Sequence, residues 1–233
     1  MHSPHDHKLL TEHFSQYISD HKKEFIEKVL HERTRHITVV MEDIYQSQNA
    51  SAVVRTCECM GLQEIHFIEN VSKYSVNPKV LKGANKWIDL VRHQEKKVNN
   101  TELCFESLRK RGYRILVADP SSDGDSINEI TVDEKLAIVM GNELKGVSGY
   151  AHDHADGKVY IPMHGFTESM NISVSAAICI HTLVTKLYKT KVNWNLSEED
   201  KNDIRLIWYK KVVRRSELIE REFFARRLAK SED

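Results

Sequence analysis

The sequence predicts an α/β protein with a mostly parallel sheet, on two observations. From position 36 onward, short apolar runs alternate with segments whose apolar side chains recur at helical spacing. Glycines follow two of those helical segments, as they commonly do at helix C-termini. Alternating strands and helices favour a parallel sheet covered by helices. Ligands of such sheets bind beyond the carboxyl ends of the strands, which directs attention to the loops after Met41, Ala118, Met140 and Pro162.

The individual elements follow in chain order. A first helical segment is expected over 8–30, and strands are expected over 37–41, 65–68, 87–91, 114–118, 136–140 and 158–162. Helices between the strands are expected over 49–60, ended by Gly61, and over 101–111, ended by Gly112. A helix with Ser169 as its N-cap is expected to continue to Leu187. The last helical region is expected from Ser197, its N-cap, to position 228.

Composition indicates a soluble globular chain with a sizeable core. Of its 233 residues, 40% are hydrophobic and 29% are charged. The longest apolar runs are far shorter than the roughly 18 to 20 residues of a membrane span, and the polar, histidine-containing start predicts no signal peptide.

The expected organisation is an N-terminal helical extension over 1–35, an α/β domain over 36–190 and a basic C-terminal helical extension over 191–233.

The cysteines predict a reduced, cytoplasmic protein. The chain has four of them, and they form no CxxC pair and show no metal-ligand spacing. No disulfide framework and no metal site are therefore expected from the sequence.

The formal net charge of zero hides a segregation of charge along the chain. Residues 119–156 contain nine acidic and two basic side chains, whereas residues 201–230 contain ten basic and four acidic ones. The basic segment is either a surface for a polyanion or a solvated helix face. Its densest group of bases, the candidate contacts to a polyanion, is Lys210, Lys211, Arg214 and Arg215.

Three loops carry polar residues in unusual places. After the first strand, Asn49 lies near a helix start, where it is either a cap or a site residue, and Arg55 is the only charge in an apolar helical stretch. Such an arginine is either a residue at the rim of the core or an anion anchor. The stretch MGNELKGVS after the fifth strand has Gly141 and Gly146 for tight turns, with Glu143 projecting between them. A glycine loop alone is only a weak nucleotide signal.

The third loop, within IPMHGFTESMNISVSAAI over 161–178, mixes apolar and small polar residues. Gly165 permits a ligand to approach the backbone closely. Ser169, Asn171 and Ser173 place hydrogen-bonding groups around a helix N-terminus, which attracts negative charge. The loop is either a ligand site or a capped helix with incidental hydroxyls.

Taken together, these loops resemble one known family. The stretches QNASAVVRTCECMG, IVMGNELKGVS and IPMHGFTESMNISVSAA look like the three ordered motifs of the SpoU branch of the SPOUT RNA 2′-O-methyltransferases. The stretch GANKW over 83–87 and the helical flanks resemble the TrmH-type tRNA guanosine-18 methyltransferases within that branch. The likeness spans roughly residues 33–188.

The resemblance implies a fold, a cofactor and a set of site residues. Members have an α/β sheet with a deep C-terminal trefoil knot, work as homodimers and methylate a ribose 2′-hydroxyl with S-adenosylmethionine, without a metal. By this likeness the cofactor would lie against Ala118, Gly141, Asn142, Ile161, Met163, Gly165, Ser169 and Met170. The implied catalytic residues are Asn49, Arg55, Glu143, Ser169 and Asn171.

The role of Arg55 and the identity of the RNA stay open at this point. A guanidinium rarely gives up its proton, so an anion clamp is a better expectation for Arg55 than a general base. The expected substrate is tRNA, because only about 35 residues precede the first strand and leave little room for a separate RNA-binding domain. The alternatives are ribosomal RNA, or a non-catalytic RNA-binding module on the same fold.

Overall fold

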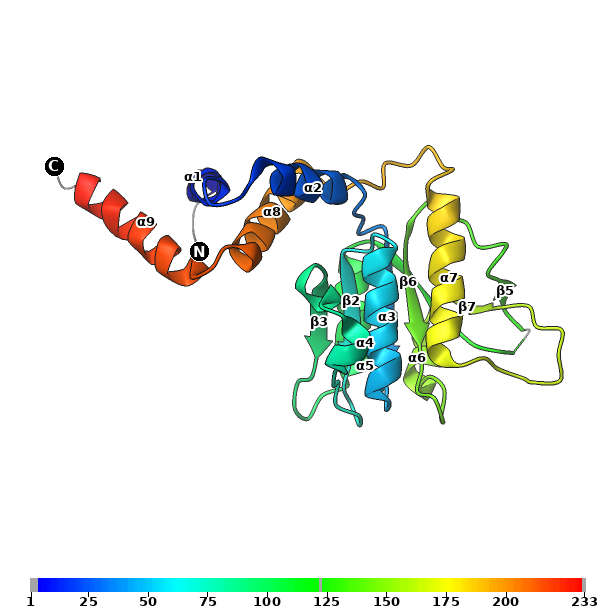
Figure 1. Cartoon of the computed structure of the whole chain (residues 1–233). Coiled ribbons are helices and arrows are strands. Elements are labelled where there is room, and N and C mark those ends of the chain that lie inside the picture. The colour runs from blue at the N-terminus through cyan, green and yellow to red at the C-terminus, as the bar shows by residue number, and fades with distance from the viewer. Residues whose placement is uncertain (1–3, 122, 232–233) are drawn as a thin grey trace. The chain divides into compact units, whose positions relative to one another are not determined.

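The computed structural model describes residues 4–121 and 123–231 and divides into two compact units. One unit is Thr34–Trp194, and the other combines Met1–Arg33 with Asn195–Asp233. The described residues before position 34 and those after position 194 therefore belong to one unit (Figure 1).

The unit Thr34–Trp194 is built on a seven-stranded sheet in the order β3-β2-β1-β6-β4-β7-β5. Every neighbouring pair in this sheet is parallel, which confirms the predicted class. The strands are β1 Ile37–Glu42, β2 Glu64–Ile68, β3 Asp89–His93, β4 Tyr113–Ala118, β5 Asp125–Ser126, β6 Lys135–Met140 and β7 Gly157–Tyr160. The two-residue strand β5 was not expected, and it is too short to leave a periodic signal in the sequence.

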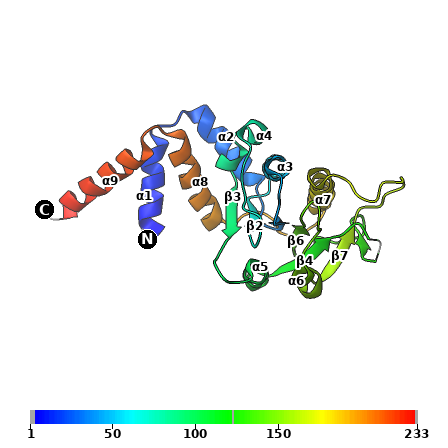
Figure 2. The same cartoon turned by 90° about the horizontal axis from the view of Figure 1, so that it is seen from below.

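Helices cover both faces of the sheet (Figures 1 and 2). One face carries α3 Ser47–Cys59, the short α4 Pro78–Leu81, the 3₁₀ turn η1 Ala84–Lys86 and α7 Ile172–Leu187. The other face carries α5 Asn100–Lys110 and α6 Gly149–His154. Successive strand residues enter opposite cores, so Val39 packs under α3 and α7 while Val40 packs under α5. Burial on both faces explains why the strands read as continuous apolar runs.

Of the four helix-ending or helix-capping residues named from the sequence, three are confirmed. Gly61 and Gly112 follow α3 and α5 with φ of +80° and +79°, a left-handed conformation that glycine adopts without strain. Ser197 caps α8, Glu198–Val212, since its side chain accepts a hydrogen bond from the Asp200 N–H. The prediction of Ser169 as the cap of α7 is wrong: the helix begins at Ile172, and the Asn171 side chain accepts from the Ser173 N–H. Asn171 directly precedes the first helical residue, so its side chain can reach the Ser173 N–H, which has no partner within the helix.

The second unit contains four helices within the described residues: α1 Pro4–Ser15, α2 Asp20–His31, α8 Glu198–Val212 and α9 Ser216–Ser231. The expectations of one continuous helix over 8–30 and one over 197–228 are therefore wrong. Tight turns after Phe14 and Ser15 and the extended Ser19 separate α1 from α2. Arg215, with φ of +57°, lies between α8 and α9. Side-chain periodicity continues across these short breaks, which hides them in the sequence.

Charges of the C-terminal segment are mostly balanced inside this unit. The unit as a whole, residues 1–33 and 195–233, holds fifteen acidic and fifteen basic residues. The bases of α8 and α9 pair with acids within the unit, as in Arg205–Glu27 at 2.5 Å, Lys210–Glu220 at 2.6 Å and Arg227–Asp6 at 2.6 Å. Pairing of this kind leaves fewer of these cations available to a polyanion than the sequence suggests.

In the described part of the chain, no helix combines the length and apolar character needed to cross a membrane.

Candidate functional site

A cavity of about 560 Å³ lies at the carboxyl edge of the sheet in the unit Thr34–Trp194. The ends of β4 and β6, the segment after β7 and the starts of α3 and α7 surround it. Its size is that of a small-molecule site, which typically measures about 300 to 1,000 Å³. The lining residues are Gln46, Asn49, Ala118, Asp119, Pro120, Met140, Gly141, Asn142, Glu143, Leu144, Gly146, Val159, Ile161, Met163, Ser169, Met170, Asn171, Ile172, Ser175 and Cys179.

The structure brings most of the predicted site residues together. The predicted residues that line the cavity are Asn49, Ala118, Gly141, Asn142, Glu143, Ile161, Met163, Ser169, Met170 and Asn171. Arg55 and Gly165 do not line it. The four predicted polyanion contacts, Lys210, Lys211, Arg214 and Arg215, belong to the other unit.

A chain of hydrogen bonds joins the three motif loops. Asn49 Nδ2 donates to Glu143 Oε1 at 2.9 Å, and Asn171 Nδ2 donates to Asn49 Oδ1 at 3.2 Å. Asn49 is 7% exposed, so water competes little for these bonds. Because each of the three residues comes from a different loop, Asn49 couples the position of one loop to the other two.

Glu143 is held as a carboxylate. Besides the Asn49 amide, it accepts hydrogen bonds from the backbone N–H groups of Tyr45 at 3.0 Å and Gln46 at 3.1 Å. Burial raises the pKa of Glu143, but these hydrogen bonds outweigh burial and hold its pKa below the usual range. A fixed negative charge therefore lies at the cavity wall.

The loop after β6 is a tight turn that only certain residues permit. A Cβ at position 141 would lie 2.2 Å from the carbonyl carbon of Gly146, so glycine is required there. Asn142 forms backbone hydrogen bonds with Gly146, and its side chain donates to the Asp43 carbonyl at 2.7 Å. Gly165 differs, because a Cβ there would meet nothing within 4 Å of the protein.

The Arg55 side chain is exposed and forms no hydrogen bond or ion pair with any other residue that the structure describes. It lies six residues after Asn49 on α3, which places it about 9 Å farther along the helix axis. Its guanidinium is therefore available to an external partner, but it is not part of the cavity wall.

Several lining residues were missed by the sequence analysis. Asp119 and Pro120 directly follow β4, in a loop that was singled out without naming these side chains. Ser175 belongs to the small polar residues of the third loop, which were expected to leave room for a cofactor and a ribose, and it lines the cavity. Cys179 was missed, although it follows Asn171 and Ser175 at intervals of four residues, a spacing that is visible in the sequence and places all three on one face of α7.

Comparison with known proteins agrees with this geometry. Residues 36–181 match the model of the SpoU rRNA methylase family. A tRNA (guanosine(18)-2′-O)-methyltransferase of Borreliella burgdorferi is 41% identical over 88% of this chain and 92% of its own length. A protein of the same name from Aquifex aeolicus is 29% identical over 67% of this chain and 72% of its own length.

Solved structures show the same fold. The TrmH/SpoU tRNA modifying enzyme of A. aeolicus superposes with a TM-score of 0.72 at 27% identity, over 82% of this chain and 96% of that one. The SpoU methyltransferase AviRb of Streptomyces viridochromogenes, solved with its cofactor AdoMet, gives a TM-score of 0.58 at 18% identity, over 70% of this chain and 62% of that one. Since the family match spans more than half of the chain and the Borreliella protein is 41% identical over most of it, this chain belongs to the SpoU methylase family.

Proposed function

We propose that this protein methylates the ribose 2′-hydroxyl of guanosine 18 in tRNA, using S-adenosylmethionine. The observation that carries the proposal is the convergence of the three motif loops on one cavity, joined through Asn49, Glu143 and Asn171. The choice of tRNA and of guanosine 18 is supported by the names of the Borreliella and Aquifex relatives.

The cavity suits S-adenosylmethionine in its chemistry as well as its size. Apolar side chains such as Met140, Ile161 and Met163 offer a surface for the adenine. The carboxylates of Asp119 and Glu143 lie on the wall, where they favour a cationic ligand. The bound cofactor would supply an electrophilic methyl group on its sulfonium. Gly141, whose tight turn exposes backbone, would contribute main-chain contacts.

A bound cofactor would donate its methyl group to the ribose oxygen and leave as the neutral thioether, and the ribose hydroxyl would lose its proton to water. Asn49 and Asn171 would hold the ribose side of the cavity, and Ser169, an exposed residue of the cavity lining, would contact cofactor and substrate. Glu143 would keep Asn49 in place. Arg55 would act as an electrostatic clamp on the developing alkoxide or on an adjacent phosphate.

Methyl transfer to tRNA tests the proposal directly. Unmodified tRNA transcript incubated with labelled cofactor should become methylated, and a transcript with a 2′-deoxy nucleotide at position 18 should not. Transfer to the deoxy transcript would overturn the choice of position, and transfer to ribosomal RNA alone would overturn the choice of substrate. Absence of transfer to any RNA, together with RNA binding and no binding of S-adenosylmethionine in calorimetry, would favour a non-catalytic RNA-binding module.

Arg55 raises a separate question, because it lies outside the cavity of its own chain. We propose a homodimer, which would also cover exposed apolar side chains near the cavity such as Leu144, at 85% exposure, and Phe166. Light scattering tests the dimer. Mixed dimers of Arg55→Ala and Asn171→Ala chains then show where Arg55 acts: activity is recovered if it serves the partner's cavity, and stays absent if it serves its own.

The remaining parts of the proposal concern RNA contacts, chain path and location. Arg214 and Arg215 are exposed and offer phosphate contacts, with Lys211 beside them, whereas Lys210 is already paired with Glu220.

A trefoil knot is proposed for the segment that includes β7 and α7, because loops after β4, β6 and β7 all border one cavity. A tRNA substrate and free cysteines both suit the cytoplasm.

A further inference from the structure

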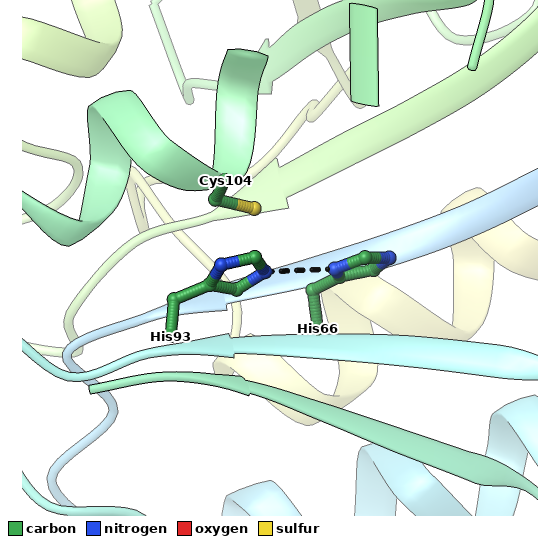
Figure 3. A group of neighbouring side chains, drawn as sticks. All are labelled: His66, His93 and Cys104. Carbon is green, nitrogen blue, oxygen red and sulfur yellow. Dashed lines mark hydrogen bonds between the residues drawn. The ribbon is translucent and has the colours of Figure 1, made fainter. Parts of the chain in front are cut away.

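A second polar cluster lies between the sheet and helix α5, apart from the residues that line the cavity. His66 of β2, His93 of β3 and Cys104 of α5 each offer one ligand atom, and these atoms lie within 4.8 Å of one another. His66 Nδ1 is 3.0 Å from His93 Nε2, and Figure 3 shows the Cys104 thiol above the two imidazole rings. His66 and Cys104 are fully buried, and His93 is half-buried.

Glu64 determines which nitrogen of His66 faces this cluster. Its Oε1 lies 3.0 Å from His66 Nε2, and Arg111 Nη2 lies 2.6 Å from the same oxygen. With its Oε1 facing His66 Nε2 and Arg111, the Glu64 side chain accepts a hydrogen bond from the Nε2–H of His66, which leaves the lone pair of His66 on Nδ1, toward His93. Carboxylates orient metal-binding histidines in this manner.

A buried acidic side chain, Glu42, contacts Thr101, which precedes Cys104 by one helical turn on α5. The Thr101 hydroxyl donates to Glu42 Oε1 at 2.5 Å, and the backbone N–H and hydroxyl of Ser148 donate to the same side chain. Glu42 is 2% exposed, and no cationic side chain pairs with it among the residues that the structure describes. An acidic side chain buried without a cation favours a positive centre nearby.

We propose that His66 Nδ1, His93 Nε2 and Cys104 Sγ bind Zn²⁺ or a chemically similar divalent ion. Zinc takes nitrogen ligands at about 2.0–2.1 Å and thiolate at about 2.3 Å, which in a tetrahedron separates two nitrogens by about 3.3 Å and nitrogen from sulfur by about 3.6 Å. The two nitrogens, at 3.0 Å, are already near that spacing. The ligand atoms lie within 4.8 Å of one another, so the sulfur would have to move by roughly 1 Å at most to reach its spacing.

The fourth ligand is a water molecule that reaches the ion past the half-buried His93. On binding, the neutral His93 ring shifts its proton from Nε2 to Nδ1 by exchange with solvent, which frees the Nε2 lone pair, and the Cys104 thiol releases its proton to solvent and becomes a thiolate, so the bound centre has a net charge of +1. The three ligands come from two strands and a helix, which is why no spacing pattern in the sequence pointed to them. The ion would tie the sheet edge formed by β2 and β3 to α5, and would stabilise the folded chain.

Titration of metal-free, untagged protein with Co²⁺ tests the site. The histidines near the N-terminus, His2, His5 and His7, are replaced by alanine first, because they are a separate source of metal binding. We expect one equivalent of Co²⁺ to produce a thiolate-to-cobalt charge-transfer band in the near ultraviolet. The band should vanish in Cys104→Ser and persist in Cys59→Ser, the matched control for an exposed thiol.

Two further variants keep the test decisive if Cys104→Ser does not fold. His93→Asn should weaken Co²⁺ binding at least tenfold, and Glu64→Gln should weaken it by about 10- to 100-fold through the loss of His66 orientation. Absence of the band in the starting protein at saturating Co²⁺ overturns the proposal. A band that survives Cys104→Ser, one that is lost in Cys59→Ser, or an affinity unchanged by His93→Asn overturns it equally.

Discussion

Replacement of Asn49 by alanine tests whether the hydrogen-bond chain organises the site. The change removes a donor to Glu143, a donor to Gln46 and an acceptor for Asn171. Glu143 keeps its two backbone donors, so the cost lies at the low end for a bond to a charged group, about 1–2 kcal/mol in the free energy of unfolding. For a unit of this size, that corresponds to a fall in Tm of roughly 2–8 °C.

The effect on turnover should be larger than the effect on stability. With the three loops uncoupled, a shift of about 1 Å at the reacting groups costs on the order of 100-fold in kcat. Single-turnover methyl transfer to tRNA measures this, and differential scanning fluorimetry measures Tm. Gln46→Ala is the matched control, because it removes one 3.2 Å partner of Asn49 and leaves the Glu143 bond intact. If kcat of Asn49→Ala stays within about threefold of the wild type, or if Gln46→Ala falls equally far, the reasoning is wrong.

Three other perturbations test the proposed roles. Changing Arg214 and Arg215 to alanine should weaken tRNA binding and lower the slope of log K against log salt by about 0.7–0.9 per lost phosphate contact. Lys210→Ala should change this slope little, because the Lys210 ammonium is already paired with Glu220. Equal slopes in all variants would contradict the proposed phosphate contacts. Ser175→Leu should fill the cavity and weaken S-adenosylmethionine binding at least tenfold by calorimetry, while Val174→Leu, at an exposed position next to it, should not; matching affinities would remove Ser175 from the site. Because folding lowers the pKa of Glu143, the ionised side chain stabilises the fold above pH 4.5, and this stabilisation is lost as the pH falls below that value. In urea denaturation, Glu143→Gln should therefore lose less free energy of unfolding between pH 7 and pH 3 than the wild type. Parallel curves would refute the hydrogen-bonded carboxylate at Glu143.

The site residues implied by the family resemblance fall into two groups. Asn49, Glu143 and Asn171 converge on one cavity, as the resemblance implied. Arg55 and Gly165 lie outside the cavity lining, and the proposed role of Arg55 depends on which cavity of the dimer it serves. Motif order along the chain identifies which loops meet, but it does not say which side of each loop faces the ligand.

The sequence by itself determined the features that depend on neighbours a few residues apart. Buried strands such as β1, the glycines that end α3 and α5, and the Ser197 cap all follow from local apolar period, backbone freedom and hydrogen bonding. The tertiary structure alone decided the features that depend on long-range pairing. The order that inserts β6 between β1 and β4 brings Glu143 to Asn49, and the packing of α5 on β2 and β3 brings Cys104 to His66 and His93. Chain segments far apart in sequence meet only through the burial of whole sheet faces, and no local pattern encodes which segments those are.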